Sequence, residues 1–593
     1  MRLSIISLLF FGVFLTGHSQ DYWQQHAYYF IDVNLDSEKH LLTGAMDISY
    51  KNNSPDTLTH AFFHLYFNAF QPGSMMDQRS CHIPDPDKRI YERIANLNPD
   101  EIGYCRIDAI SIDNEPVDFE ITETVMKVFF NKPLSPKSSI LFHIEFTEQV
   151  PVQIRRSGRN NKEGIDYTMA QWYPKLAEYD RRGWHPIPYV AREFYGVWAD
   201  YDVSITLDRK YIIGGTGIPK ARIKMPGQKD KWVFEAKMVH DFAWCADPDY
   251  QHDSIEVDDE FMIHFYYQTD TLAEQWKEVQ PEVVKIFKIA NQVFGRYPYS
   301  RYSVVQGGDG GMEYPMSTFI LGHGSKKGKV GLITHEGMHS WYYGVLANNE
   351  FLHAWMDEGM ATYAEEFIMD SLYPNPNRFF MEFDYENYRR YTQSGAEEPM
   401  STPSDFLETN LAYWGNAYVK GGITMNMLRY IIGDFAFYSG IKDYYYKWQF
   451  KHPEPNDFFK IMEEHSGLKL DWFQHRWLNT THHIDYSISA VQKDGKSTLI
   501  ELLKKGQFPM PINLEVTLKS GEKMRYHIPI EMTYGVKNLE DQTELLSIWP
   551  WTQSNYSTEI PIRTKDIVKI EIDPEHQLPD IYTQDNIYPQ TSE

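Results

Sequence analysis

The chain has 593 residues and an ordinary globular composition, with 42% hydrophobic and 23% charged residues. Its formal net charge is −25, from 57 Lys and Arg against 82 Asp and Glu. This balance argues against nucleic acid as a partner, because proteins that bind a phosphate backbone concentrate positive charge. The length exceeds what one hydrophobic core supports, so we expect three or four domains of ~100–200 residues each.

The first residues have the layout of a secretory signal peptide. Arg2 gives a short positive start, residues 3–15 are almost entirely apolar, and Gly17 and Ser19 are small residues before a cleavage site. This pattern predicts a signal peptide at 1–19 and export to the periplasm, the cell surface or the medium. The apolar run is shorter than the ~20 residues of a membrane span. An uncleaved N-terminal anchor is the alternative, and no transmembrane segment is expected after cleavage.

Residues 20–271 are typical of a large N-terminal antiparallel β domain. Segments such as AYYFIDVNLD and YDVSITLD alternate apolar and polar residues, and turn-forming residues separate them. This alternation indicates strands with one buried face.

Two further changes of pattern divide the rest of the chain. Residues 272–482 begin with helical spacing in LAEQWKEVQPEVVKIFKIANQVFG and continue with long helical stretches, so they predict a helix-rich domain with a small strand element. Residues 483–593 return to short alternating segments such as HIDYSISAVQ and INLEVTLKS, which predict a C-terminal β-sandwich. The expected fold class is therefore multidomain α+β.

The chain contains three cysteines, Cys81, Cys105 and Cys245. After export a disulfide between Cys81 and Cys105 is permitted, and three unpaired thiols are the alternative, because sequence alone does not fix connectivity. No CxxC pair occurs, so a thiolate zinc site is not indicated.

The strongest chemical signal is the segment THEGMHSW at residues 334–341. His335 and His339 are four residues apart, so on a helix they lie one turn apart on the same face and can hold one metal ion. Glu336 follows the first histidine and can reach a water on that metal without being a ligand. A helix with two surface histidines is the alternative.

A third ligand candidate follows in WMDEGMATYAEE, a predicted helical stretch that carries Glu358, with eighteen residues between it and the second histidine. Two histidines and one carboxylate with an open fourth position form a catalytic rather than a structural zinc arrangement. Glu365 lies seven residues later on the same face. It is a candidate to orient a metal-binding histidine, and a solvated helix charge is its alternative.

These motifs, together with the upstream GGMEYP, resemble the M1 family of gluzincin zinc aminopeptidases. The resemblance implies a β domain followed by a thermolysin-like helical catalytic domain. It covers nearly the whole chain, and the part shared by all family members corresponds to residues 26–475. The predicted C-terminal β-sandwich departs from the family members that carry a large helical C-terminal domain.

The resemblance also implies a binding site for the substrate's amino terminus. The family's G-x-M-E-N strand corresponds to Gly310, Gly311, Met312 and Glu313, and Tyr314 replaces its Asn. In the family this Glu binds the free α-amino group, which a carboxylate can do by pairing with an ammonium. Without the resemblance, this segment would be interpreted as a glycine-rich turn.

Two other residues correspond to family positions. Tyr418, in the segment AYVKGG, matches a Y-x-K-G motif whose Tyr hydrogen-bonds the oxyanion of the tetrahedral intermediate. Gln171, in YTMAQWYPKL, has a setting similar to that of a Gln that lines the amino-terminus pocket. Core packing is the alternative for Tyr418.

The expected function is hydrolysis of the N-terminal peptide bond of peptides with a free N-terminus, by a zinc-activated water with Glu336 as general base. One Zn²⁺ per chain is expected. Two alternatives stay open, an endopeptidase of thermolysin type and a catalytically silent peptide-binding protein.

Overall fold

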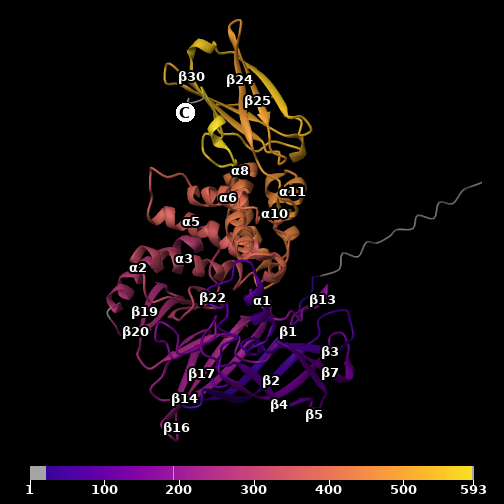
Figure 1. Cartoon of the computed structure of the whole chain (residues 1–593), viewed down its shortest axis with the longest axis vertical. Helices are drawn as coiled ribbons and strands as arrows, with labels where there is room; N and C mark the ends of the chain where they lie inside the picture. Colours follow the sequence, from indigo (N-terminus) through magenta and orange to yellow (C-terminus); the bar gives the residue numbers. More distant parts are fainter. Residues whose placement is uncertain (1–21, 191, 271, 590–593) are drawn as a thin grey trace, which may run out of the picture.

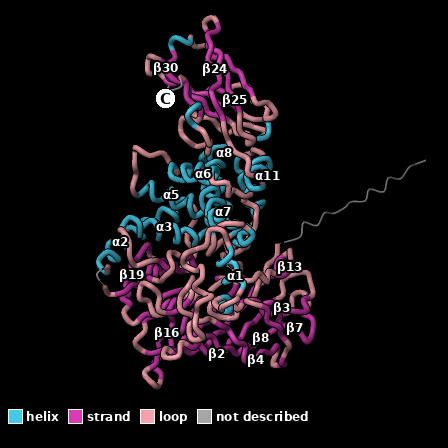
Figure 2. Tube along the Cα trace, in the orientation of Figure 1, coloured by secondary structure: helices cyan, strands magenta, loops and turns pink. Residues whose placement is uncertain are grey.

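The computed structural model describes residues 22–190, 192–270 and 272–589, in three regions stacked along the long axis (Figure 1). A strand-rich region lies at one end, helices occupy the middle, and a second strand-rich region lies at the other end (Figure 2). The multidomain α+β class predicted from the sequence is therefore confirmed. The predicted signal peptide at 1–19 lies outside the described residues and stays a prediction.

The N-terminal region is built around an eight-stranded sheet. Its strands alternate buried and partly exposed residues, as the sequence pattern predicts. All its pairs are antiparallel except β1 with β14, which run parallel. In spatial order the strands are β16 (Ile218–Met225), β17 (Lys229–Val239), β14 (Ala199–Asp208), β1 (His26–Asp36), β2 (Leu41–Lys51), β8 (Ser139–Gln149), β4 (Tyr104–Ile112) and β5 (Glu115–Pro116).

Smaller sheets and one helix complete this region. A core rich in aromatic side chains, including Trp172 and Trp244, joins them to the large sheet. The helix is α1 (Met75–His82), which begins at Ser74, whose side chain accepts a hydrogen bond from the Asp77 amide. The strands, in sheet order, are β11 (Lys175–Leu176), β3 (Leu58–His64), β7 (Val125–Leu134) and β6 (Phe119–Thr122); β15 (Ile212–Gly215), β18 (Trp244–Asp247), β10 (Tyr167–Met169) and β9 (Gly158–Arg159); and β12 (Tyr179–Asp180) with β13 (Gly183–Trp184).

A five-stranded sheet connects the β domain to the helices. Its order is β19 (Tyr250–Asp258), β20 (Phe261–Gln268), β21 (Arg301–Gln306), β23 (Ser317–Ile320) and β22 (Met312–Tyr314). The short edge strand β22 runs antiparallel to β23 and carries Glu313. The predicted domain boundary at 271/272 falls inside this sheet, because β19 and β20 precede it. The domain bounds themselves stay predictions.

The helical region packs around one large core that also includes β19 to β21. The helices that matter for the site are α3 and α5, which pack against each other, and α8, which packs against α5. The helices are α2 (Ala273–Val293), α3 (Lys326–Tyr342), α4 (Glu350–Ala354), α5 (Met360–Leu372), α6 (Glu382–Gln393), α7 (Asn410–Trp414), α8 (Gly421–Ile432), α9 (Asp434–Trp448), α10 (Pro455–Ser466) and α11 (Asp471–Asn479).

Two sheets form the C-terminal region, and their buried residues are continuous with the core of the helical region. The first contains β24 (Tyr486–Asp494), β25 (Ser497–Lys504) and β29 (Asn555–Ile560). The second contains β28 (Thr543–Leu545), β27 (Lys523–Ile528), β26 (Ile512–Leu518), β30 (Ile567–Ile572) and β31 (Ile587–Tyr588).

Cys81, Cys105 and Cys245 are all unpaired thiols. Of the two alternatives for the cysteines, the structure therefore has the one without a disulfide. No helix in the described part of the chain combines the length and apolar character needed to cross a membrane.

Candidate active site

Helix α3 presents the two histidines of the HEGMH segment. The helix begins after Ser325, whose hydroxyl accepts a hydrogen bond from the Gly328 amide. Most of its remaining surface is buried, so its rotation about its own axis is fixed by packing on both sides. His335 and His339 consequently point to one place, with their Nε2 atoms 3.2 Å apart.

Glu358 completes a three-donor group with these histidines. Its Oε2 lies 3.3 Å from His335 Nε2 and 3.2 Å from His339 Nε2. A tetrahedral zinc with bonds of about 2.0–2.1 Å would place its ligand atoms about 3.3–3.4 Å apart. The three donors therefore fit the base of a tetrahedral site whose fourth position faces the cavity.

A second carboxylate contacts each of the two histidines at its Nδ1 atom. His335 Nδ1 lies 3.1 Å from Glu365 Oε2, so the position of Glu365 agrees with its predicted orienting role. His339 Nδ1 lies 2.5 Å from Asp357 Oδ1, in a fully buried contact. A hydrogen bond at Nδ1 leaves Nε2 as the metal-binding nitrogen and fixes the ring. Sequence reasoning missed Asp357, although its place directly before Glu358 in an otherwise apolar segment could have indicated it.

Glu336 lies on the cavity wall beside the three donors. Burial, reinforced by the nearby Glu313 carboxylate, raises the pKa of Glu336 to about 8. Its carboxylate occupies the space in front of Gly311, where a Cβ would overlap it. The lack of a side chain at Gly311 therefore leaves space for the carboxylate of Glu336, the predicted general base. The neighbouring Gly310 has φ +114°, a conformation that suits glycine.

Glu358 and Tyr418 both lie on wide, π-helical turns, Trp355–Gly359 (η2) and Gly415–Lys420 (η4). Such turns occur frequently at functional sites because they displace a side chain from the regular helical position. The two turns are in contact through glycines: a Cβ on Gly421 would lie 2.7 Å from the Cα of Gly359. This close approach lets the Tyr418 hydroxyl donate a hydrogen bond to Glu358 Oε1.

We expect that the close contact between Gly359 and Gly421 leaves no space for a side chain at either position. We expect Gly359→Ala to lower the free energy of unfolding by about 1–3 kcal/mol, because the new methyl group meets backbone atoms that cannot rotate away. Moving the turn also shifts Glu358, so metal bound per chain should fall. Gly337→Ala is the matched control, since its Cβ would meet nothing closer than 3.9 Å. Normal stability and metal content in Gly359→Ala would refute this account.

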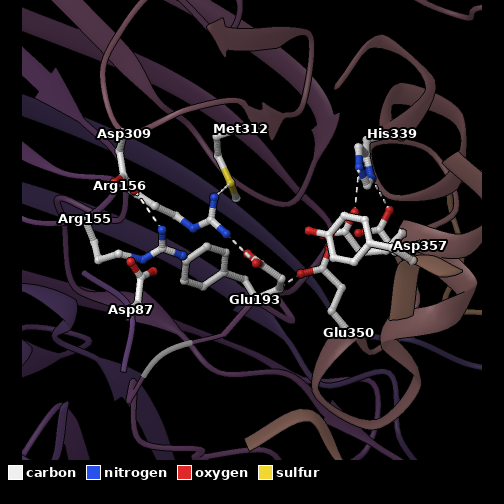
Figure 3. A network of polar contacts seen from close by, with 12 residues as sticks. Asp87, Arg155, Arg156, Glu193, Asp309, Met312, His339, Glu350 and Asp357 are labelled. Atoms are coloured by element: carbon white, nitrogen blue, oxygen red, sulfur yellow. Dashed lines mark hydrogen bonds and ion pairs between the residues drawn. The ribbon is translucent and has the colours of Figure 1, made fainter. Parts of the chain in front are cut away.

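Glu313 lies on β22 at the side of the metal-donor group, close to His339. Its side chain is buried, and its Oε1 has no hydrogen-bond partner among the described residues. Behind it, Arg156 forms a buried ion pair with Glu193 and also contacts the Met312 sulfur. Figure 3 shows this network reaching from the β domain toward His339 and Asp357. Burial raises the pKa of Glu313, and the adjacent His339 opposes that rise.

Gln171 is one of four predicted site residues that do not line the cavity, the others being Gly310, Met312 and Glu365. Its side-chain amide donates to Asp241 at 2.9 Å, and the Tyr314 hydroxyl lies 3.5 Å from its carbonyl oxygen. Gln171 therefore lies behind β22, on the side of Tyr314 that faces the β-domain core. Met312 is buried at the cavity margin, where it packs against Arg156.

The three metal donors line one cavity of about 430 Å³ between the β domain and the helical region, together with Glu336, Glu313, Gly311 and Tyr418. Beyond the predicted residues it is lined by several arginines and by Glu193, none of which sequence reasoning identified. Their spacing along the chain bears no fixed relation to the metal motif, so no sequence signal pointed to them. The arginines are Arg79, Arg89, Arg155, Arg156 and Arg192.

Comparison with known proteins gives consistent results. The chain is 20% identical over 437 residues to Aminopeptidase 2 of Candida albicans, covering 67% of this chain and 44% of that protein. It is 26% identical over 226 residues to Leucine aminopeptidase 2 of Chaetomium globosum, covering 34% and 36%. Aminopeptidase M1-A of Oryza sativa subsp. japonica is 24% identical over 168 residues, covering 28% and 19%. The matches thus span less than half the length of these curated relatives.

The fold is shared with solved structures. An M1 zinc metallopeptidase mutant from Deinococcus radiodurans, bound to a Tyr-Ser-Ala substrate, matches with a TM-score of 0.55 and 15% identity. The match covers 77% of this chain and 94% of that one. A second structure of such a mutant from this organism matches with a TM-score of 0.54 and 14% identity.

The model of the peptidase family M1 domain matches residues 282–477. This segment contains His335, His339, Glu358, Glu336 and Glu313, together with Tyr418 on the turn beside them. The family match, the shared fold and the three-donor group agree, and residues 282–477 of this chain match the peptidase family M1 domain.

Proposed function

We propose that this protein is a zinc-dependent aminopeptidase that removes the first residue from peptides with a free N-terminus. The observation that carries the proposal is Glu313, a buried carboxylate beside the metal-donor group with one oxygen that no described residue satisfies. An ammonium group at that position would supply the missing donor and the missing positive charge.

The charges around Glu313 favour an ammonium over a neutral group. Two carboxylates, Glu313 and Glu193, lie near a single guanidinium, and Arg156 is paired with Glu193. One negative charge therefore stays unbalanced next to the metal-donor group. Burying such a charge is costly unless a cation pairs with it. The α-amino group of a peptide is that cation, and its position would place the first peptide bond at the metal site.

The donor chemistry of His335, His339 and Glu358 fits one zinc per chain, with an open fourth position. Bound zinc would act there as a Lewis acid toward the scissile carbonyl and would acidify the attacking water. Glu336 would accept a proton from that water at its carboxylate and pass it to the departing amine. The Tyr418 hydroxyl, which donates to Glu358 in this structure, would turn to donate to the developing oxyanion.

The test compares two substrates that differ only at the amino terminus. Leucine p-nitroanilide should be hydrolysed, and its N-acetylated form should lose about 100-fold or more in kcat/KM, because acetylation removes the charge that pairs with Glu313. Glu313→Gln should abolish most of this difference by slowing the free-amine substrate alone.

The alternatives predict other outcomes in the same assay. An endopeptidase of thermolysin type would hydrolyse blocked peptides at internal bonds, and Glu313→Gln would change little. A silent peptide-binding protein would hydrolyse neither substrate even when metal analysis finds one zinc per chain. Either result would overturn the proposed function.

A further inference from the structure

The cavity extends past the metal-donor group into a wall that is rich in arginine. This wall comes from the β domain: Arg79 lies on α1, and Arg192 lies in the loop between β13 and β14. Tyr413 and Tyr418, from the helical region, also line this cavity. The β-domain side of the cavity is thus rich in positively charged side chains, although the chain as a whole carries a net charge of −25.

Three of the arginines are neutralised by nearby carboxylates. Arg89 pairs with Asp87 at 2.7 Å, Arg155 pairs with Asp309 at 2.8 Å, and Arg156 pairs with Glu193. The Arg155–Asp309 and Arg156–Glu193 pairs are part of the network in Figure 3. Their guanidinium groups therefore have little capacity for another anion.

Arg79 and Arg192 differ from these three, because neither has an ion-pair partner within the described ranges. Asp405 is close enough to influence the pKa of both, but it forms no ion pair with either one. Asp85 also lines the cavity, but it is engaged at the start of α7, where it accepts hydrogen bonds from the Asn410 and Leu411 amides. Of these two acids, Asp405 alone is thus left to balance the positive charges of Arg79 and Arg192.

Arg192 is buried to an extent that is unusual for an unpaired arginine. Its exposed fraction is 9%, and its Nε and Nη2 have no hydrogen-bond acceptor among the described residues. Its guanidinium carbon lies 4.2 Å from the centre of the Tyr413 ring, so the plane is held by stacking while the edge is left for an acceptor. An unpaired buried charge is costly, so the arrangement indicates a site that is completed by an anionic ligand.

Both guanidinium groups are charged at neutral pH. Burial lowers the pKa of Arg79 to about 10, with a further contribution from the neighbouring Arg192. Burial likewise lowers the pKa of Arg192. The two like charges are held near each other, and a bridging carboxylate would relieve their repulsion.

The separation between the two arginines and the metal-donor group limits which groups of a substrate can contact Arg79 and Arg192. The Tyr413 ring lies 6.1 Å from the Tyr418 ring, which itself contacts the metal ligand Glu358. The Tyr413 and Tyr418 side chains, which meet edge to face, therefore lie between Arg192 and the metal-donor group. An extended peptide advances ~3.3–3.6 Å per residue, so a group on the first residue or on the next one or two can span this distance.

We propose that Arg192 and Arg79 form a subsite for a carboxylate of the peptide substrate. The inference rests on the proposed function and names its substrate class: peptides with a carboxylate near the first peptide bond. Two sources supply the same chemistry, the side chain of an acidic first residue and the C-terminal carboxylate of a dipeptide or tripeptide. Bidentate pairing with Arg192, supported by Arg79, would hold either one.

The first experiment separates the two sources on the zinc-loaded full chain. One arm compares glutamate and glutamine p-nitroanilides, which differ in the side-chain carboxylate and have no C-terminal one. The other arm compares trialanine with trialanine amide. We expect kcat/KM to favour the carboxylate by about 10-fold or more in at least one arm. Equal values in both arms would overturn the proposal, even if all four substrates are hydrolysed.

The second experiment assigns the preference to the arginines. Arg192→Gln should reduce kcat/KM for the preferred carboxylate substrate by about 30-fold or more and leave its neutral counterpart within about threefold. Arg79→Gln should act in the same direction with a smaller effect, and Arg192→Lys should retain part of the preference. Arg106→Gln, on the exposed edge of β4, is the surface control.

The melting temperature distinguishes a binding role from a structural one. Removing an unpaired buried charge should leave the Tm of Arg192→Gln unchanged or higher, whereas a structural arginine would lower it. An equal loss of kcat/KM on charged and neutral substrates, or a lowered Tm with no change of preference, would overturn the subsite. Absence of turnover with every substrate, including leucine p-nitroanilide, would instead overturn the proposed function on which the subsite depends.

Discussion

Replacing Glu336 with glutamine is expected to lower kcat by about 10²–10⁴-fold while zinc stays bound. The size follows from the usual contribution of a positioned general base. Zinc should stay because the three donors come from His335, His339 and Glu358, and Glu336 is not among them. Glutamine keeps the shape of the side chain in the space in front of Gly311, so the fold around the site should not change.

The measurement combines metal analysis with steady-state kinetics on leucine p-nitroanilide. Glu386→Gln is a suitable control, because Glu386 lies on the exposed face of α6 and pairs with Arg390 away from the cavity. If Glu336→Gln kept a rate near that of the wild type, Glu336 could not be the general base. If it lost zinc together with activity, the separation of ligand and base roles would be wrong.

The second large effect is expected from Tyr418→Phe. Loss of one donor to a developing oxyanion typically costs about 10²–10³-fold in kcat. The phenyl ring preserves the packing against His335 and Tyr413, whose ring centroids lie 5.8 and 6.1 Å from that of Tyr418. The substitution therefore removes the hydroxyl and little else, so KM should change far less than kcat.

Tyr438→Phe provides the matched comparison for Tyr418→Phe. The Tyr438 hydroxyl lies 3.1 Å from that of Tyr363 in the helical core, away from the metal-donor group. This variant should keep wild-type kinetics. A Tyr418→Phe enzyme that lost affinity for substrate but kept its kcat would indicate a binding role instead of oxyanion stabilisation.

The metal site was predictable because its geometry is mostly local. His335 and His339 are four positions apart on one helix, and that spacing alone fixes their relative direction. The distance along the chain to Glu358 was recognisable through the family resemblance. The π-helical turn that carries Glu358 was not predictable, because it depends on the contact between Gly359 and Gly421 from two separate segments.

Features that depend on contacts between distant segments could not be predicted from the sequence. The parallel pairing of β1 with β14 joins strands that are far apart along the chain, whereas alternation of apolar residues reports only burial. Gln171 illustrates the same problem at the level of one residue: its flanking residues resemble a pocket motif, yet its side chain donates to Asp241 and does not line the cavity. Arg79 and Arg192 meet only because α1 and a distant loop line one cavity.

The cavity lies where two separately packed cores meet, and this has a consequence for how the protein can vary. The two histidines of the metal-donor group, Glu358 and Tyr418 lie on elements of the helical core, whereas α1 and the loop with Arg192 belong to the β-domain core. The residues that would perform the chemistry and the residues that would select the substrate thus lie on elements that pack into different hydrophobic cores. Substitutions that remodel selectivity can accumulate on one side of the cavity without disturbing the packing that aligns the reaction on the other.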